Sequence, residues 1–109
     1  MLITSFSECM SLAMLEALSF GIPVISTPVS GAREVLEDND CGIVVNTFSP
    51  NILANTVIEL IKNEAMVNRL RMNALKVIKN KYNEENMVAN HFKMYKSIIT
   101  KKTEKECVE

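Results

Sequence analysis

Two glutamates are the only charged residues in a long, mostly apolar stretch near the start of the chain. The stretch covers residues 7–26 and reads SECMSLAMLEALSFGIPVIS, with the charges at Glu8 and Glu16. An ionised carboxylate only accepts hydrogen bonds, so it suits a ligand that donates them, such as the hydroxyl groups of a sugar. It is a poor partner for phosphate, which is itself anionic. If the fold brings the pair together, the site favours a polyhydroxylated ligand.

The elements around these glutamates alternate between short apolar strands and helices. Apolar, β-branched runs between turn residues predict strands, near residues 1–5, 22–26 and 43–46. Good helix formers and apolar residues at helical spacing predict helices, near residues 11–20, 32–37, 50–61, 64–81 and 83–99. This alternation predicts an α/β fold with a short parallel sheet of about three strands and flanking helices. Because a strand begins at residue 1, we expect the C-terminal part of a larger domain.

Glu8 falls in the loop between the first predicted strand and the first predicted helix. Ser11 can cap that helix, so the N–H groups of Leu12 and Ala13 at its start are free to receive a phosphate. Helix side chains lean toward the N-terminus, so Glu16 can reach back to the same place. The residues alone thus indicate a site for an anion joined to a polyol. Two plainer interpretations stay open: Glu16 as the exposed edge of an amphipathic helix, and Glu8 as a solvated loop residue.

A longer set of motifs resembles one known family. The stretch that holds the two glutamates resembles the E-x7-E signature of the retaining group 1 glycosyltransferases of GT-B fold. Gly31 and Glu34, and the turn DCGIVV at residues 40–45, resemble segments that follow this signature in the family. The similarity covers about residues 1–99, which would form the Rossmann-like, nucleotide-sugar-binding C-terminal part of the fold.

The resemblance implies a role for each residue of this loop and helix start. Glu8 would accept hydrogen bonds from hydroxyl groups of the donor sugar, which makes it the predicted catalytic residue. Glu16 would hold the ribose hydroxyls of the nucleotide. Backbone N–H groups would line the sugar first and then the diphosphate, in the order Cys9, Met10, Ser11, Leu12 and Ala13. The resemblance implies no metal ion and no other cofactor.

Cys9 stands where glycine is common in the family, and a cysteine would be strained there if the position needs a positive φ. No histidine lies near it in the sequence, so we expect a structural thiol rather than a nucleophile. We expect His91 to be a polar residue of the last helix rather than a ligand or a base.

The resemblance also implies parts that these residues do not supply. The family's N-terminal half, with the acceptor site, a catalytic histidine and the basic residues that clamp the diphosphate, would precede residue 1. Arg33 is the only cation in residues 1–61, and we expect it to be a surface residue. We therefore expect the donor-binding part of an enzyme that transfers a sugar with retention to a sugar or lipid-linked acceptor. Such a part would serve polysaccharide or glycoconjugate synthesis and would be inactive alone.

Two other functions stay open at this point. The chain could be a non-catalytic nucleotide-sugar-binding module that acts with a separate N-terminal partner. It could also be a fragment of a sugar-nucleotide epimerase of GT-B fold.

Charge and cysteine content exclude some classes of function. Residues 1–61 carry one cation and seven acids, a net charge of −6, whereas residues 62–109 carry eleven cations and six acids, a net charge of +5. These cations are mixed with acids along helices, which indicates a solvated surface and no nucleic-acid partner. Three cysteines, odd in number and far apart, are typical of reduced thiols in a cytoplasmic protein.

The two ends of the helical part carry separate expectations. The last helix should turn an inward face toward the core, made of Val88, Phe92, Tyr95 and Ile99. Residues 100–109 should form a polar, disordered tail, with peripheral contact of its lysines to a membrane as the alternative. No apolar run reaches the ~20 residues that a membrane span needs.

Overall fold

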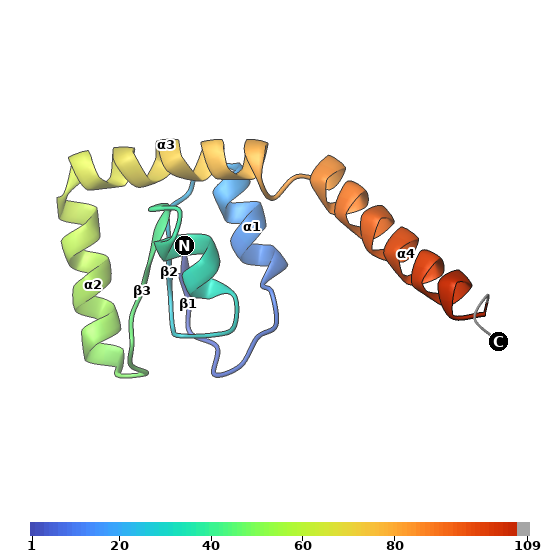
Figure 1. The fold of residues 1–109 in the computed structure, drawn as a ribbon. Helices are drawn as coiled ribbons and strands as arrows, with labels where there is room; N and C mark the ends of the chain where they lie inside the picture. Colours follow the sequence, from blue (N-terminus) through green and yellow to red (C-terminus); the bar gives the residue numbers. More distant parts are fainter. Residues whose placement is uncertain (107–109) are drawn as a thin grey trace.

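A computed structural model describes residues 1–106, with side chains described to residue 100, and contains one parallel sheet (Figure 1). Its strands are β1 (Leu2–Ile3), β2 (Val24–Ser26) and β3 (Gly42–Val44), in the order β1-β2-β3. Both neighbouring pairs are parallel, with Leu2 opposite Ile25 and Ile25 opposite Ile43. The predicted α/β fold and its three strands are therefore confirmed.

Helices cover both faces of the sheet because successive strand side chains point to opposite faces. Ile3 and Val24 belong to one buried cluster, which they share with α1 (Leu12–Ser19) and η1 (Arg33–Glu37). Ile25 belongs to a second cluster, which it shares with α2 (Pro50–Lys62). This burial on both faces explains why the strands are apolar throughout.

The first two helices begin and end as the sequence predicts. Ser11 is the N-cap of α1, and its hydroxyl accepts a hydrogen bond from the N–H of Met14 at 3.3 Å. Gly21 follows that helix with a φ of +67°, the left-handed conformation that ends it. The predicted helix near residues 32–37 is present as the π-helix η1. There the Asp38 N–H donates to the Arg33 carbonyl at 3.1 Å.

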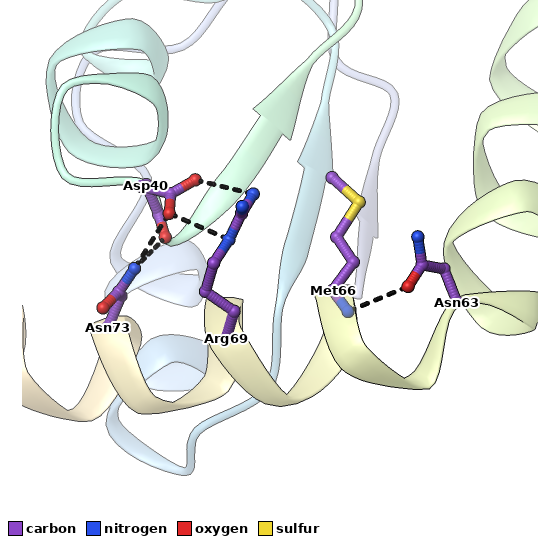
Figure 2. A network of polar contacts seen from close by, with 5 residues as sticks. All are labelled: Asp40, Asn63, Met66, Arg69 and Asn73. Atoms are coloured by element: carbon purple, nitrogen blue, oxygen red, sulfur yellow. Dashed lines mark hydrogen bonds and ion pairs between the residues drawn. The ribbon is translucent and has the colours of Figure 1, made fainter.

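The long helix α3 (Glu64–Asn80) lies across both clusters and is tied to the turn before β3. Asn63 caps α3 by accepting a hydrogen bond from the Met66 N–H at 3.0 Å. Figure 2 shows Arg69 and Asn73 of α3 converging on Asp40 of that turn. These contacts tie α3 to the turn that leads into β3.

The last helix, α4 (Glu84–Glu106), does not pack as predicted. It points away from the sheet (Figure 1), and the predicted inward face is exposed to 56–66% at Val88, Phe92, Tyr95 and Ile99. That prediction was wrong because both faces of the sheet are already covered by the preceding helices. Neither buried cluster of the described residues includes a residue of α4.

The predicted polar tail lies only partly within the described residues. α4 continues to Glu106, past residue 100 where the tail was expected to begin, and residues 107–109 lie outside the description. Within residues 1–106, no helix is both long and apolar enough to cross a bilayer.

Candidate functional site

The loops that leave the carboxyl ends of the three strands meet at one edge of the sheet. The Thr27 hydroxyl, just after β2, donates to the Ser5 carbonyl, just after β1, at 2.6 Å. The ring of Phe6 stacks on that of Phe48, from the loop after β3, with centroids 4.8 Å apart. In open parallel sheets this edge is where ligands bind.

The loop from β1 to α1 holds the site predicted from the sequence. Its residues run from Glu8 through the exposed Cys9 and Met10 to the buried cap Ser11, after which α1 begins. Among residues 1–106, no hydrogen bond is donated by five successive backbone N–H groups, those of Cys9, Met10, Ser11, Leu12 and Ala13. Such a row of free donors at the positive end of a helix suits an anion.

Glu8 is half-buried and is fixed by its own loop. The Ser5 hydroxyl donates to Oε1 of Glu8 at 2.9 Å. Oε2 makes no hydrogen bond with any other described residue. One oxygen of the carboxylate therefore holds the loop, and the other can accept a hydrogen bond from a ligand hydroxyl.

Glu16 lies in the second turn of α1 with an exposed side chain. Within the described part of the chain, its carboxylate makes no hydrogen bond or ion pair. Its carbonyl accepts from the Ser19 hydroxyl at 2.6 Å, a contact local to the helix. Glu16 is thus on the predicted helix and free to bind a ligand. The same exposure fits the alternative in which it only borders the helix surface.

Cys9 does not adopt the conformation that would strain it. Asp40 is the one non-glycine residue with a positive φ among residues 1–106. The left-handed conformation nearby belongs instead to Gly31, with a φ of +78°, in the loop after β2. A Cβ atom on Gly31 would lie 3.3 Å from Cε of Met10 and 3.5 Å from the Cys9 carbonyl. Gly31 therefore lets the loop after β2 pack against the predicted sugar-binding loop.

Arg33 is exposed at the start of η1, at the same edge of the sheet. Its guanidinium donates to the side-chain oxygen of Asn46, which follows β3.

His91 lies far from this edge, on the exposed α4, where its ring contacts the carbonyl of Met87 at 2.8 Å. Among residues 1–106 no group of three or more His, Cys, Asp or Glu side chains could hold a metal ion. The absence of a cofactor stays a prediction.

A hollow of about 330 Å³ opens beside Phe6 and Phe48, on the α2 side of the sheet. Its lining is mainly apolar and contains no charged residue. It therefore does not suit a diphosphate.

Sequence patterns did not identify Ser5, Thr27, Phe6 or Phe48 as residues of this edge. Each follows a strand, and that position was the only sign in the sequence that they would meet.

The short parallel sheet with its flanking helices matches the C-terminal, Rossmann-like part of a GT-B domain. The structure resembles sucrose-phosphate synthase from Thermosynechococcus elongatus with a TM-score of 0.81 and 23% identity, over 91% of this chain and 25% of that one. The sequence profile described as "Glycosyl transferases group 1" matches residues 1–77. The chain belongs to the group 1 glycosyltransferases.

Curated relatives match most of this chain and are much longer than it. N-acetyl-alpha-D-glucosaminyl L-malate synthase of Bacillus anthracis is 27% identical over 99 residues, which are 91% of this chain and 26% of the relative. Poly(glycerol-phosphate) alpha-glucosyltransferase of Bacillus subtilis (strain 168) is 30% identical over 104 residues, 94% of this chain and 15% of the relative. The chain thus spans about a quarter or less of these proteins.

Proposed function

We propose that this chain is the donor-binding part of a retaining glycosyltransferase and that its ligand is a nucleotide sugar. The observation that carries the proposal is the row of free backbone N–H groups from Cys9 to Ala13, flanked by Glu8 and Glu16. Amides at a helix start suit a diphosphate, and carboxylates suit sugar hydroxyls. In a nucleotide sugar the sugar is joined to the diphosphate and the diphosphate to the ribose, which is the order of Glu8, the free amides and Glu16 along the chain.

Each predicted residue keeps its role in this proposal. Glu8 accepts hydrogen bonds from the donor sugar, and Glu16 holds the ribose. The N–H groups nearest Glu8, those of Cys9, Met10 and Ser11, line the sugar, and those of Leu12 and Ala13 bind the diphosphate. No metal ion is needed in this arrangement, because the amides and the helix dipole offset part of the phosphate charge.

We further propose that transfer needs a second GT-B domain, which binds the sugar or lipid-linked acceptor. Three features support this. Residues 1–61 carry one cation, Arg33, to offset a diphosphate. Leu2 of the edge strand β1 is 45% exposed, and α4 presents apolar side chains to solvent. The relatives carry much more polypeptide than this chain does. Two relatives are named as a glucosaminyl malate synthase and a poly(glycerol-phosphate) glucosyltransferase, and these names support a role in polysaccharide or glycoconjugate synthesis.

The binding claim is tested by NMR titration of the ¹⁵N-labelled chain. UDP, GDP and ADP, and then UDP-glucose, UDP-N-acetylglucosamine, GDP-mannose and ADP-glucose, would be added in turn. We expect at least one diphosphate to shift the amide signals of Leu12 and Ala13, and its nucleotide sugar to shift those of Cys9 and Met10 as well. Saturating shifts elsewhere on the chain, or none with any of the seven ligands, would contradict the proposal.

The claim that a second domain is needed is tested by activity. The purified chain should transfer no sugar from the donor that it binds to any added acceptor. Transfer by the chain alone would contradict this claim and would leave the donor site intact. A non-catalytic binding module with a partner chain predicts the same absence of transfer. The two alternatives differ when the chain is joined to the N-terminal half of a related enzyme. The enzyme part should then transfer sugar, whereas a non-catalytic module should not.

A further inference from the structure

Two hydrogen bonds in series tie the loop that carries Glu8 to the end of the neighbouring strand β2. The Thr27 hydroxyl donates to the Ser5 carbonyl at 2.6 Å, and the Ser5 hydroxyl donates to Oε1 of Glu8 at 2.9 Å. These bonds connect the end of β2, through the end of β1, to the carboxylate assigned to the donor sugar. Ser5 and Glu8 are three residues apart, whereas Thr27 lies 22 residues from Ser5.

Thr27 is a rigid starting point for this connection. Its side chain is fully buried, and its N–H donates to the Ile3 carbonyl at 3.0 Å. Its own carbonyl accepts from the Ser26 hydroxyl at 2.9 Å and from the Val29 N–H at 2.7 Å. With the backbone held on both sides, the hydroxyl of Thr27 has one position from which to bind Ser5.

We propose that Ser5 and Thr27 are positioning residues for Glu8, and that through Glu8 they raise the affinity for the sugar part of the donor; this rests on the proposed function. The Ser5 hydroxyl occupies one carboxylate oxygen and thereby fixes the side chain of Glu8. The remaining oxygen then faces the ligand in one orientation. Without the hydroxyl, Glu8 would rotate freely, and the sugar would have to order it on binding.

The proposal separates two ligands that share a nucleotide. A nucleoside diphosphate contacts Glu16 and the amides of α1, so its affinity should not depend on Ser5 or Thr27. A nucleotide sugar also needs Glu8, so its affinity should. Loss of one net hydrogen bond in the connection predicts a loss of about fivefold in nucleotide-sugar affinity.

The experiment is calorimetric titration of four variants with the best-binding nucleoside diphosphate and its nucleotide sugar. Ser5→Ala and Thr27→Val remove the hydroxyl groups. Thr27→Ser removes only a methyl group and keeps the donor. Ser7→Ala removes an exposed hydroxyl from the same loop that makes no hydrogen bond within the described residues. Circular dichroism checks that each variant is folded.

We expect Ser5→Ala and Thr27→Val to weaken nucleotide-sugar binding about fivefold and to leave the diphosphate unchanged. Thr27→Ser and Ser7→Ala should bind both ligands as the original chain does. Equal weakening of both ligands, or a loss in Thr27→Ser that matches Thr27→Val, would overturn the positioning role and leave the donor site standing. If the original chain binds neither ligand, the proposed function falls and this role falls with it.

A second measurement examines the connection without any ligand. The ¹³C signal of the Glu8 carboxyl carbon should shift in Ser5→Ala and in Thr27→Val, and should stay in place in Ser7→Ala. An unchanged signal in Thr27→Val would show that Thr27 does not act on Glu8, whatever the binding data give.

Discussion

Nε of Arg69 lies 3.1 Å from the carboxylate of Asp40, so an ion pair joins the middle of α3 to the turn before β3 (Figure 2). Asn73, one turn further along α3, donates to the carbonyl of Asp40 at 2.8 Å and to its carboxylate at 3.0 Å. Asp40 also has a φ of +47°, which is unfavourable for most side chains. The contacts from α3 therefore hold the turn in a conformation that few residues adopt.

We predict that Asp40 contributes more to stability than Arg69 does. Both side chains of the ion pair are more than half exposed, so Arg69→Gln should lower the free energy of unfolding by at most about 1 kcal/mol. Asp40→Ala should cost about 1–2 kcal/mol, because it puts alanine at a positive φ and removes the oxygen bound by Asn73. Asp40→Gly, which tolerates that φ, should cost less than Asp40→Ala. Urea unfolding measures all three, and a larger loss in Arg69→Gln than in Asp40→Ala would refute this ranking.

Gly42 should be the glycine whose replacement destabilises the chain most. A Cβ atom there would overlap the carbonyl oxygen of Val24 and lie 2.7 Å from Cδ2 of Leu36. Because neither the β2 backbone nor the buried Leu36 can move easily, Gly42→Ala should cost about 3 kcal/mol or more. Gly21→Ala is the matched control. There the positive φ costs about 1 kcal/mol and the nearby Arg71 side chain can move aside. Similar losses at the two positions would contradict the packing argument.

The cysteines should differ in reactivity. Burial, and secondarily the charge of Asp40, raises the pKa of the Cys41 thiol to about 11, and its sulfur lies 3.1 Å from the Val35 carbonyl. Cys9 is exposed. Iodoacetamide at pH 8 should therefore modify Cys9 and spare Cys41 in the folded chain. Tryptic peptides distinguish the two thiols, since cleavage after Arg33 and Lys62 separates them. Rapid modification of Cys41 in the folded chain would contradict its burial.

The raised pKa of Cys41 also predicts how stability depends on pH. In the unfolded chain the thiol ionises near pH 9, whereas in the folded chain it keeps its proton to about pH 11. Between these values the folded state binds more protons, so the free energy of unfolding should fall as the pH rises. Cys41→Ala should show a smaller fall over the same interval. An equal fall in both proteins would mean that other groups cause it.

Removal of α4 should leave the rest of the fold intact. α4 projects from the body of the chain (Figure 1), and the buried clusters contain no residue beyond Tyr82. A chain that ends at Asn83 should therefore unfold within a few degrees of the original temperature. It should also associate less at high concentration, because the apolar side chains of α4 are gone. A drop of more than about 10 °C would show that α4 stabilises the sheet, since 1 kcal/mol corresponds to ~4–8 °C in a domain of this size.

The sequence predicted the helices and strands well because the residues that mark each one lie within it or next to it in the chain. The strands follow from apolar runs bounded by turn residues. Ser11 and Gly21 mark the two ends of α1 through a cap and a left-handed residue. The prediction that α4 has an inward face was wrong. Amphipathic spacing shows that a helix has an apolar side, but it does not show what lies opposite that side.

The candidate site was predictable in part for the same reason. Glu8, Ser11 and the free amides lie within one loop and one helix start, so their order along the chain already places them together. The hydrogen bond from Thr27 to Ser5 joins residues 22 positions apart, and the contact of Gly31 with Met10 depends on how two loops pack. Neither relation leaves a periodic pattern in the sequence.

Whether Glu8 and Glu16 bind different parts of one nucleotide sugar is tested most directly by titrating Glu8→Gln and Glu16→Gln with a nucleoside diphosphate and with its nucleotide sugar. Glu59→Gln, which removes an exposed charge on α2, serves as the control. We predict that Glu16→Gln weakens both ligands by about 1.5–3 kcal/mol, whereas Glu8→Gln weakens only the nucleotide sugar, with folding nearly unchanged in both. Equal losses for both ligands at both positions would contradict the division of roles. No loss in Glu16→Gln would show that this residue only borders the surface of α1.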